Sequence, residues 1–168
     1  GVYINELEDK LYFSSEGQQS MGGYDLFYTE RDVDGNWKEP VNLGYPINTH
    51  KNEVGLIVNT FGTIAYYSSN RKEGREKDIF TFKLPEAAQP VSSSYMKGKV
   101  YDAETKEPLK ARFELISLDN ENLVMDSYSD GRDGEFLVSI PTNNDYVLNV
   151  SKKGYLFYSD NFQLKGEY

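Results

Sequence analysis

The 168-residue sequence contains no cysteine, a single histidine and a single tryptophan. The absence of cysteine excludes disulfides, thiolate zinc ligands and a cysteine nucleophile. Because His50 is the only histidine, any metal site that needs several imidazole ligands is excluded as well. The sequence therefore lacks the residues for thiolate or multi-histidine metal sites and for a cysteine nucleophile.

Positive charge is also scarce, and long apolar runs are missing. Eighteen Lys and Arg residues against 27 Asp and Glu residues give a net charge of −9. Because an acidic surface repels phosphate backbones, we expect no nucleic-acid partner. No apolar run reaches the roughly 20 residues of a membrane helix, so we expect no direct membrane span. No signal peptide is visible, and we interpret the chain as a piece of a longer protein whose targeting signal lies upstream.

Aromatic residues are abundant, with 14 Tyr and nine Phe. Aromatic and β-branched side chains fit the half-buried surface of a sheet, and no helical periodicity is present. Hydrophobic residues make up 38% of the chain, which is enough to bury a core. The composition therefore predicts an all-β fold.

An internal repeat organises the first half of the chain. A shift of 54 positions aligns residues 1–15 with 55–69, with identities at Gly1, Asn5, Tyr12 and the Ser14-Ser15 pair. After one deletion, residues 24–27 align with 77–80. The repeat predicts strands at 2–5, 11–15 and 25–29, and again at 55–59, 64–68 and 78–82. A turn at 32–37, with Asp34-Gly35 at its centre, leads to a further strand.

Four short antiparallel strands per repeat are typical of a β-propeller blade, so residues 1–84 predict about two blades of a partial propeller. Since roughly four to eight blades close a propeller, these two must expose strand edges and apolar faces. We expect the chain to associate through its first 83 residues, or to pack its second domain against them.

Residues 11–55 resemble the TolB-type, WD40-like propeller repeat of bacterial envelope proteins. The matching segments are 12–15 (YFSS), 22–27 (GGYDLF), 35–37 (GNW), 40–43 (PVNL), 47–49 (INT) and 53–55 (EVG). The second copy departs from the pattern, because Arg75-Glu76-Lys77 stands where the first copy has Gly22-Gly23-Tyr24.

A second β pattern follows a change of composition. Residues 85–95 are small, proline-bearing and almost uncharged, which predicts a linker. Beyond it, apolar and polar residues alternate, as at Phe136, Val138 and Ile140, and this predicts sheets with one buried face. Expected strands lie at 99–101, 111–118, 122–129, 135–140, 145–151 and 155–164. About seven short strands in residues 96–168 predict a small β-sandwich.

Residues 96–164 resemble the carboxypeptidase regulatory-like domain, which implies a transthyretin-like sandwich. The segments that carry the resemblance are 98–111 (GKVYDAETKEPLKA), 129–136 (SDGRDGEF) and 146–155 (YVLNVSKKGY).

Several motifs suggest chemistry, and each has a structural interpretation that we favour. His50-x-x-Glu53 has a zinc-ligand spacing, but a hydrolytic zinc needs three protein ligands. The Asp-Gly clusters at 32–35 and 130–134 are calcium-like, but they lack the remaining ligands and suit hairpin turns. Gly22-Gly23 precedes a strand rather than a helix, which does not suit a phosphate site. We expect no catalytic, metal-binding or cofactor-binding residue, no cofactor and no enzymatic activity.

Two further groups remain. The serine pairs 14–15 and 68–69 lack a base that could activate both, and we expect them to end strands. Exposed tyrosines could form a stacking platform for sugars or peptides, although many must fill the core. The candidates are Tyr12, Tyr24, Tyr66, Tyr67, Tyr155 and Tyr158.

The combination of TolB-type repeats followed by a regulatory-like sandwich resembles the middle region of OmpA-family, outer-membrane-associated proteins of the Bacteroidetes group. Some of these belong to the type IX secretion machinery, and a peptidoglycan-binding domain commonly follows the sandwich. The resemblance implies a non-catalytic periplasmic scaffold whose partners are other envelope proteins, with peptidoglycan bound only through a domain absent from this chain. The absence of cysteine is compatible with the periplasm.

Two alternatives stay open. A carbohydrate-binding module of a glycan-uptake system predicts an exposed cluster of aromatic side chains flanked by Asn and Asp. An accessory region of a secreted hydrolase predicts a catalytic domain elsewhere in the parent protein.

Overall fold

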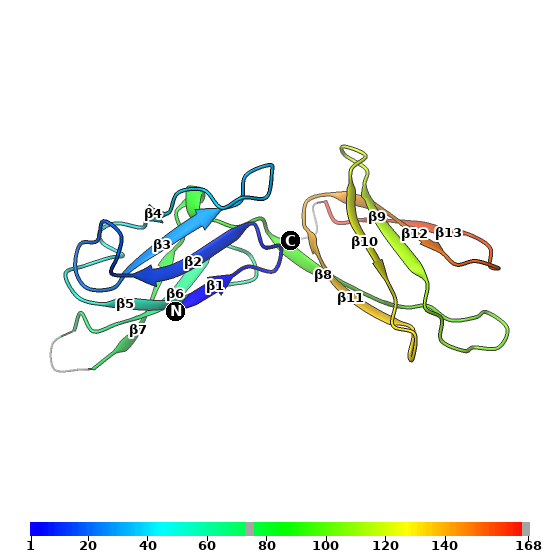
Figure 1. The fold of residues 1–168 in the computed structure, drawn as a ribbon, viewed down its shortest axis with the longest axis horizontal. Coiled ribbons are helices and arrows are strands. Elements are labelled where there is room, and N and C mark those ends of the chain that lie inside the picture. The colour runs from blue at the N-terminus through cyan, green and yellow to red at the C-terminus, as the bar shows by residue number, and fades with distance from the viewer. Residues whose placement is uncertain (73–75, 166–168) are drawn as a thin grey trace. The chain divides into compact units, whose positions relative to one another are not determined.

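The computed structural model describes residues 1–72 and 76–165, and it is an all-β protein built from antiparallel sheets (Figure 1). The chain divides into two compact units, Gly1–Ser92 and Ser93–Tyr168. None of the described sheets closes into a barrel. No helix among the described residues has the length and apolar character needed to cross a membrane.

The first unit contains two sheets whose strands follow the sequence repeat. One sheet has the order β1-β2-β3-β4 and the other has the order β5-β6-β7. Strand β2 begins at residue 10 and β6 at residue 64, a separation of 54, while β3 and β7 begin 53 residues apart, at 25 and 78. The strands are β1 (Val2–Ile4), β2 (Lys10–Ser15), β3 (Asp25–Glu30), β4 (Val41–Asn42), β5 (Glu53–Val58), β6 (Ile64–Ser69) and β7 (Asp78–Lys83).

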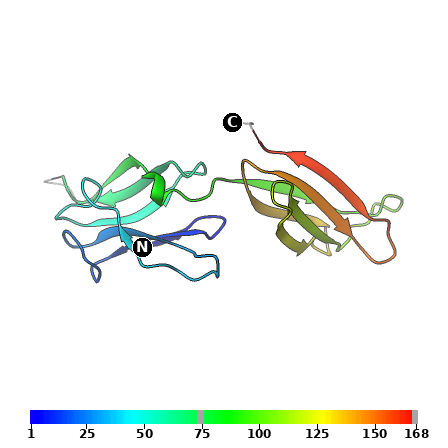
Figure 2. The same cartoon turned by 90° about the horizontal axis from the view of Figure 1, so that it is seen from above.

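The two sheets of the first unit share one core, because period-two alternation gives each an apolar face. Strand β5 lies against β1, β2 and β3, and Figure 2 shows the two sheets as layers, blue for β1 to β3 and cyan to green for β5 to β7. The buried residues of this core are Tyr12, Leu26, Leu56, Ala65, Tyr67, Leu84 and Ala88.

Strand formation after β3 and β7 is weaker than expected. After β3, the turn closes with a single bridge between Arg31 and Trp37, and the fourth strand, β4, has only two residues. The second sheet has three described strands. After β7, Pro85 has no N–H to donate to a ladder, and the chain enters the 3₁₀ helix η1 (Glu86–Ala88) instead.

Residues 85–95, the predicted linker, contain the boundary between the two units, and ordered structure lies on both sides of that boundary. Ala88 is fully buried in the first core, and its carbonyl accepts a hydrogen bond of 2.6 Å from the Tyr12 hydroxyl. The carbonyl of Ala87 accepts a hydrogen bond of 2.9 Å from the Lys10 ammonium. From Ser93 the chain is already a strand. Ala88 is the buried residue of 85–92, whose other members are exposed or half-buried, and composition does not distinguish such a packed segment from a flexible linker.

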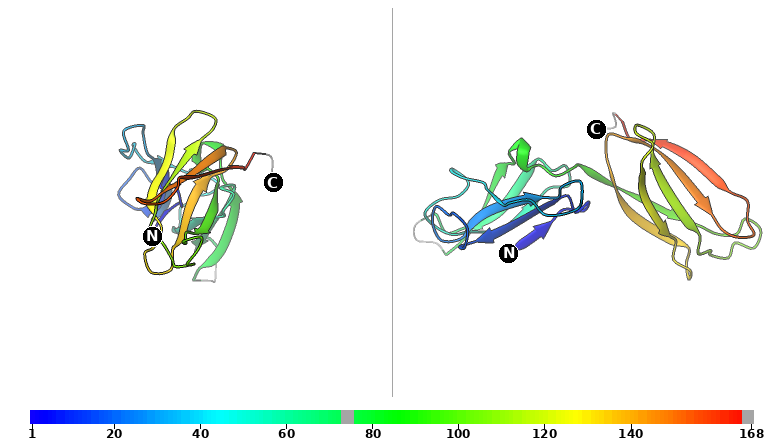
Figure 3. Two further views of the ribbon diagram at one scale, coloured as in Figure 1. Left: turned by 90° about the vertical axis from the view of Figure 1, so that its right-hand side faces the viewer. Right: turned by 45° about the horizontal axis from the view of Figure 1, so that its top comes forward.

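The second unit has six described strands, not seven, in two sheets (Figure 3). A four-stranded sheet has the order β10-β9-β12-β13, and a two-stranded sheet pairs β11 with β8. Of the strand expected at 99–101, Lys99 ends β8, and Tyr101 forms only an isolated bridge with Pro108. Leu115, Ile140 and Tyr146 form the buried core. The strands are β8 (Ser93–Lys99), β9 (Arg112–Ser117), β10 (Leu123–Tyr128), β11 (Glu135–Pro141), β12 (Asp145–Ser151) and β13 (Tyr158–Gln163).

We expect Tyr12→Phe to lower the free energy of unfolding of the first unit by about 1–2 kcal/mol, because the buried Ala88 carbonyl loses its donor. Denaturant unfolding monitored by near-ultraviolet circular dichroism measures the change. The matched control is Tyr45→Phe, whose ring is exposed. Equal stability of Tyr12→Phe and the natural chain would show that the hydrogen bond does not hold η1 in place.

The outward face of the β5-β6-β7 sheet is uncovered within its unit and carries an exposed apolar group of Ile57, Ile64, Tyr66 and Ile79 beside polar residues such as Lys83. We expect the chain to self-associate through this face and Ile79→Glu to shift it toward monomer in sedimentation velocity, because Ile79 is 81% exposed. The control is Val33→Glu in the 32–37 turn, at 102% exposure. A natural chain that stays monomeric at high concentration would contradict the prediction.

Candidate binding groove

The His50-x-x-Glu53 candidate does not form a ligand pair. Glu53 is fully buried, and its carboxylate accepts hydrogen bonds from the Thr49 amide at 2.9 Å and the Ser69 hydroxyl at 2.7 Å. The guanidinium of Arg71 lies 3.3 Å from the same carboxylate. His50 is exposed. Glu53 therefore ties the turn before β5 to the end of β6. Among the described residues, no group of three or more His, Asp or Glu side chains is arranged to hold a metal ion.

The calcium-like loops are Asx turns. The Asp32 carboxylate accepts hydrogen bonds of 2.9 Å from the amides of Asp34 and Asn36, and these bonds hold its pKa below the usual range. The Asp130 carboxylate accepts a hydrogen bond of 2.7 Å from the Arg132 amide. Its pKa is lowered mainly by this hydrogen bond. These carboxylate oxygens are occupied in closing turns of the backbone.

The Gly22-Gly23 pair serves a close approach between backbones. A side chain at Gly22 would overlap the carbonyl group of His50, and one at Gly23 would overlap the Asn52 amide. The side-chain oxygen of Asn52 also accepts a hydrogen bond of 3.0 Å from the backbone amide of Tyr24. These contacts explain the glycines without a phosphate.

A large, open and mostly apolar groove lies in the second unit, with a volume of about 1090 Å³. It exists because β8 and β11 cover only part of the wider four-stranded sheet. Inward-facing side chains from β8, β11, β12 and β13 form its floor, and the volume exceeds the roughly 300–1,000 Å³ of small-molecule pockets. The floor residues are Met96, Phe136, Ile140, Leu148, Val150 and Phe162.

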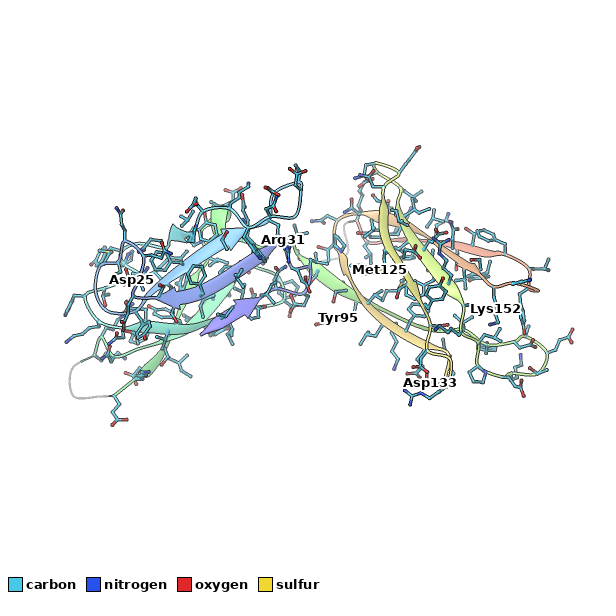
Figure 4. All side chains as sticks on the ribbon, viewed as in Figure 1. Asp25, Arg31, Tyr95, Met125, Asp133 and Lys152 are labelled. Carbon is cyan, nitrogen blue, oxygen red and sulfur yellow. The ribbon has the colours of Figure 1, made fainter. Side chains whose placement is uncertain are left out.

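Exposed aromatic side chains form the rim of the groove: Tyr95, Tyr101, Tyr155 and Tyr158. Figure 4 labels Tyr95 on β8. The Tyr155 hydroxyl donates 3.0 Å to the Asp102 carboxylate, and this hydrogen bond raises the pKa of Tyr155. The pKa of Asp102 is lowered by hydrogen bonds from the backbone amides of Thr105 and Glu104, and to a smaller extent by the one from the Tyr155 hydroxyl. The rim therefore combines rings with a fixed negative charge.

One wall of the groove has an unpaired backbone edge. Strand β8 pairs with β11 along its whole length, and no other described strand pairs with β8. An open edge presents amide and carbonyl groups in a row, which another extended chain can pair with. The groove therefore offers both apolar surface and main-chain hydrogen bonds.

The floor depends on a contact between Gly98 and Phe136. The Phe136 ring stacks on Phe113 with centroids 4.5 Å apart, and its other edge lies where a side chain at Gly98 would project. Glycine at this strand position leaves room for the ring, which a larger residue would displace toward the groove.

Of the six tyrosines proposed as a platform, Tyr12 and Tyr67 are core residues. Tyr24 and Tyr66 are exposed in the first unit, whereas Tyr155 and Tyr158 lie on the groove rim. Sequence reasoning placed the first three residues of β8 in the linker and expected a strand only from residue 99. The alternation of Ser94, Met96, Gly98 and Val100 with Tyr95, Lys97 and Lys99 is the signal that could have found it.

No family model, curated protein or solved structure matches this chain. A functional assignment therefore depends on the residues and geometry described above. The groove is the feature with the clearest chemical preference, which is for an apolar, extended ligand.

We expect Gly98→Ala to lower the free energy of unfolding of the second unit by about 1–3 kcal/mol, because the new methyl group overlaps the Phe136 ring. Thermal unfolding measures the loss. The control is Gly131→Ala, where the nearest side-chain atom would be 3.5 Å away. Unchanged stability of Gly98→Ala would show that the ring moves without cost and that the floor is not fixed.

Proposed function

We propose that this chain is a non-catalytic protein-interaction region of an outer-membrane-associated, periplasmic envelope protein of the OmpA-family type. Its second unit binds an extended segment of another envelope protein in the groove. The observation that carries the proposal is the apolar groove bordered by the unpaired edge of β8. Addition of a strand to an open sheet edge is a common mode of peptide recognition.

The domain identities belong to the same proposal: two blades of a TolB-type propeller, followed by a carboxypeptidase regulatory-like sandwich. The 54-residue strand spacing and the two layered sheets support the first identity. The pairing of β8 with β11 across a shared core from β9 and β12 supports the second. Both kinds of unit bring surfaces together rather than carry out a reaction.

The division of labour in such a complex follows from the groove. Main-chain hydrogen bonds along β8 supply affinity for any extended chain, since they do not depend on side chains. Alternate side chains of the partner then enter the floor beside Met96 and Phe162, which selects apolar residues at every second position. The tyrosine rim adds large contact area with few rotatable bonds, and residues of this kind dominate binding energy at interfaces.

The test is site-specific photo-crosslinking from the position of Tyr95, with the full chain incubated in bacterial envelope extract. We expect peptides of one envelope protein to be recovered, each with apolar residues at alternate positions. Leu156→Asp places a charge at a groove residue that is 96% exposed, so the stability of the fold should not change. Desolvating that charge on binding lowers capture about tenfold or more.

The matched control is Leu137→Asp, on a β11 residue that is 65% exposed and does not line the groove. Equal loss of capture by both variants would contradict binding in the groove. Recovery of glycan without any protein would favour the carbohydrate-binding alternative over the scaffold.

A further inference from the structure

A second, smaller hollow of about 450 Å³ lies on the outer face of the four-stranded sheet in the second unit. Phe113 and Leu115 of β9 point into the core, so Arg112, which comes directly before Phe113, points outward. Arg112 pairs with Tyr128 of β10 on one side and with Ser151 of β12 on the other. This cross-strand row forms the base of the hollow, and residues 152–157 after β12 form its side.

The hollow concentrates positive charge in an acidic protein. Lys110, Arg112, Lys152 and Lys153 all line it, while the chain as a whole carries −9. Arg112 is neutralised, because it donates 2.9 Å and 2.7 Å hydrogen bonds to Asp126 and lies 2.8 Å from Glu114. The charge available to a ligand therefore comes from the three lysines.

These lysines are not used to hold the fold through ion pairs. The Lys152 ammonium donates 2.8 Å to the carbonyl of Lys110, and the Lys110 ammonium lies 5.5 Å from the centre of the Tyr128 ring. No described carboxylate lies within ion-pair distance of Lys110, Lys152 or Lys153. A concave site lined by one sign of charge attracts ligands of the opposite sign. Figure 4 labels Lys152 in this region.

Aromatic rings form the rest of the lining. Tyr128, Tyr155 and Phe157 are all exposed and belong to β10 and to the segment between β12 and β13. The negative face of an aromatic ring attracts the weakly positive C–H groups on the flat side of a sugar ring. Rings beside lysines thus suit a ligand that has both a C–H face and an acidic group.

We propose that this hollow binds a saccharide bearing a carboxylate, such as a uronic acid, with the carboxylate at Lys152 and Lys153 and the sugar face on Tyr128. A peptide is less suited, because the base consists of the face of paired strands, Tyr128–Arg112–Ser151, and offers no open backbone edge for strand addition. The volume of about 450 Å³ matches a small ligand. The hollow shares Ser151, Lys152 and Tyr155 with the lining of the groove, but this proposal does not rest on the scaffold function.

Isothermal titration calorimetry of the full chain with trigalacturonic acid, neutral galactotriose and hexaglutamate tests the proposal. We expect trigalacturonic acid to bind, more weakly at high salt, and galactotriose and hexaglutamate to bind at least about tenfold more weakly. The double variant Lys152→Gln/Lys153→Gln and the single variant Tyr128→Ala should each weaken the binding of trigalacturonic acid about tenfold. Unchanged thermal unfolding shows that these substitutions preserve the fold.

The charge-matched control is Lys77→Gln/Lys83→Gln, on exposed lysines of the first unit, which should leave binding unchanged. Three results would overturn the proposal: no binding of trigalacturonic acid, an equal loss in the control, or binding of galactotriose as tight as that of the acid. Hexaglutamate binding that is equally tight and insensitive to Tyr128→Ala would show a general basic patch instead. Groove crosslinking from Tyr95 is unaffected by any of these outcomes, so the two proposals fail separately.

Discussion

Each sheet in this protein has two faces, and the chain supplies a full cover for only one of them. In the first unit, β5 to β7 cover one side of β1 to β4, and the sheets share a core around Tyr12 and Tyr67. Their remaining faces carry exposed apolar residues such as Ile79. In the second unit, a two-stranded sheet lies on a four-stranded one, and the shortfall in width is the groove. The surfaces available for binding follow from this mismatch.

Buried polar groups fix the loops between those sheets. Asn48 is fully buried, and its side-chain amide exchanges hydrogen bonds of 2.8 Å and 2.9 Å with the backbone of Leu26, as a neighbouring strand would. Glu53 plays a corresponding part with Thr49, Ser69 and Arg71. Removing one member of such a network leaves a desolvated group without a partner, which costs far more than the bond contributes. Residues that look reactive in the sequence are thus occupied by structure.

The sequence carries enough information for the all-β class and the positions of most strands, because period-two alternation and the 54-residue repeat report local geometry directly. Strands β2, β3, β6 and β7 lie within one residue of their expected bounds. It carries less about β8, since small residues such as Gly98 are selected by contact with Phe136, which is distant in sequence. The groove and the basic hollow could not be predicted either. They combine residues from β8 to β13, and their shape depends on the unequal width of two sheets.

The attachment of η1 to β2 has a consequence for how this architecture evolves. Tyr12, near the start of the repeat region, donates to the carbonyl of Ala88 beyond the second repeat, and Lys10 does the same with Ala87. A duplication or deletion whose breakpoint fell between residues 84 and 88 would separate Tyr12 and Lys10 from these acceptor carbonyls. A junction after Ala88 keeps both hydrogen bonds within the first unit. A segment whose composition resembles a linker therefore belongs to the first unit, and the boundary between the units follows it.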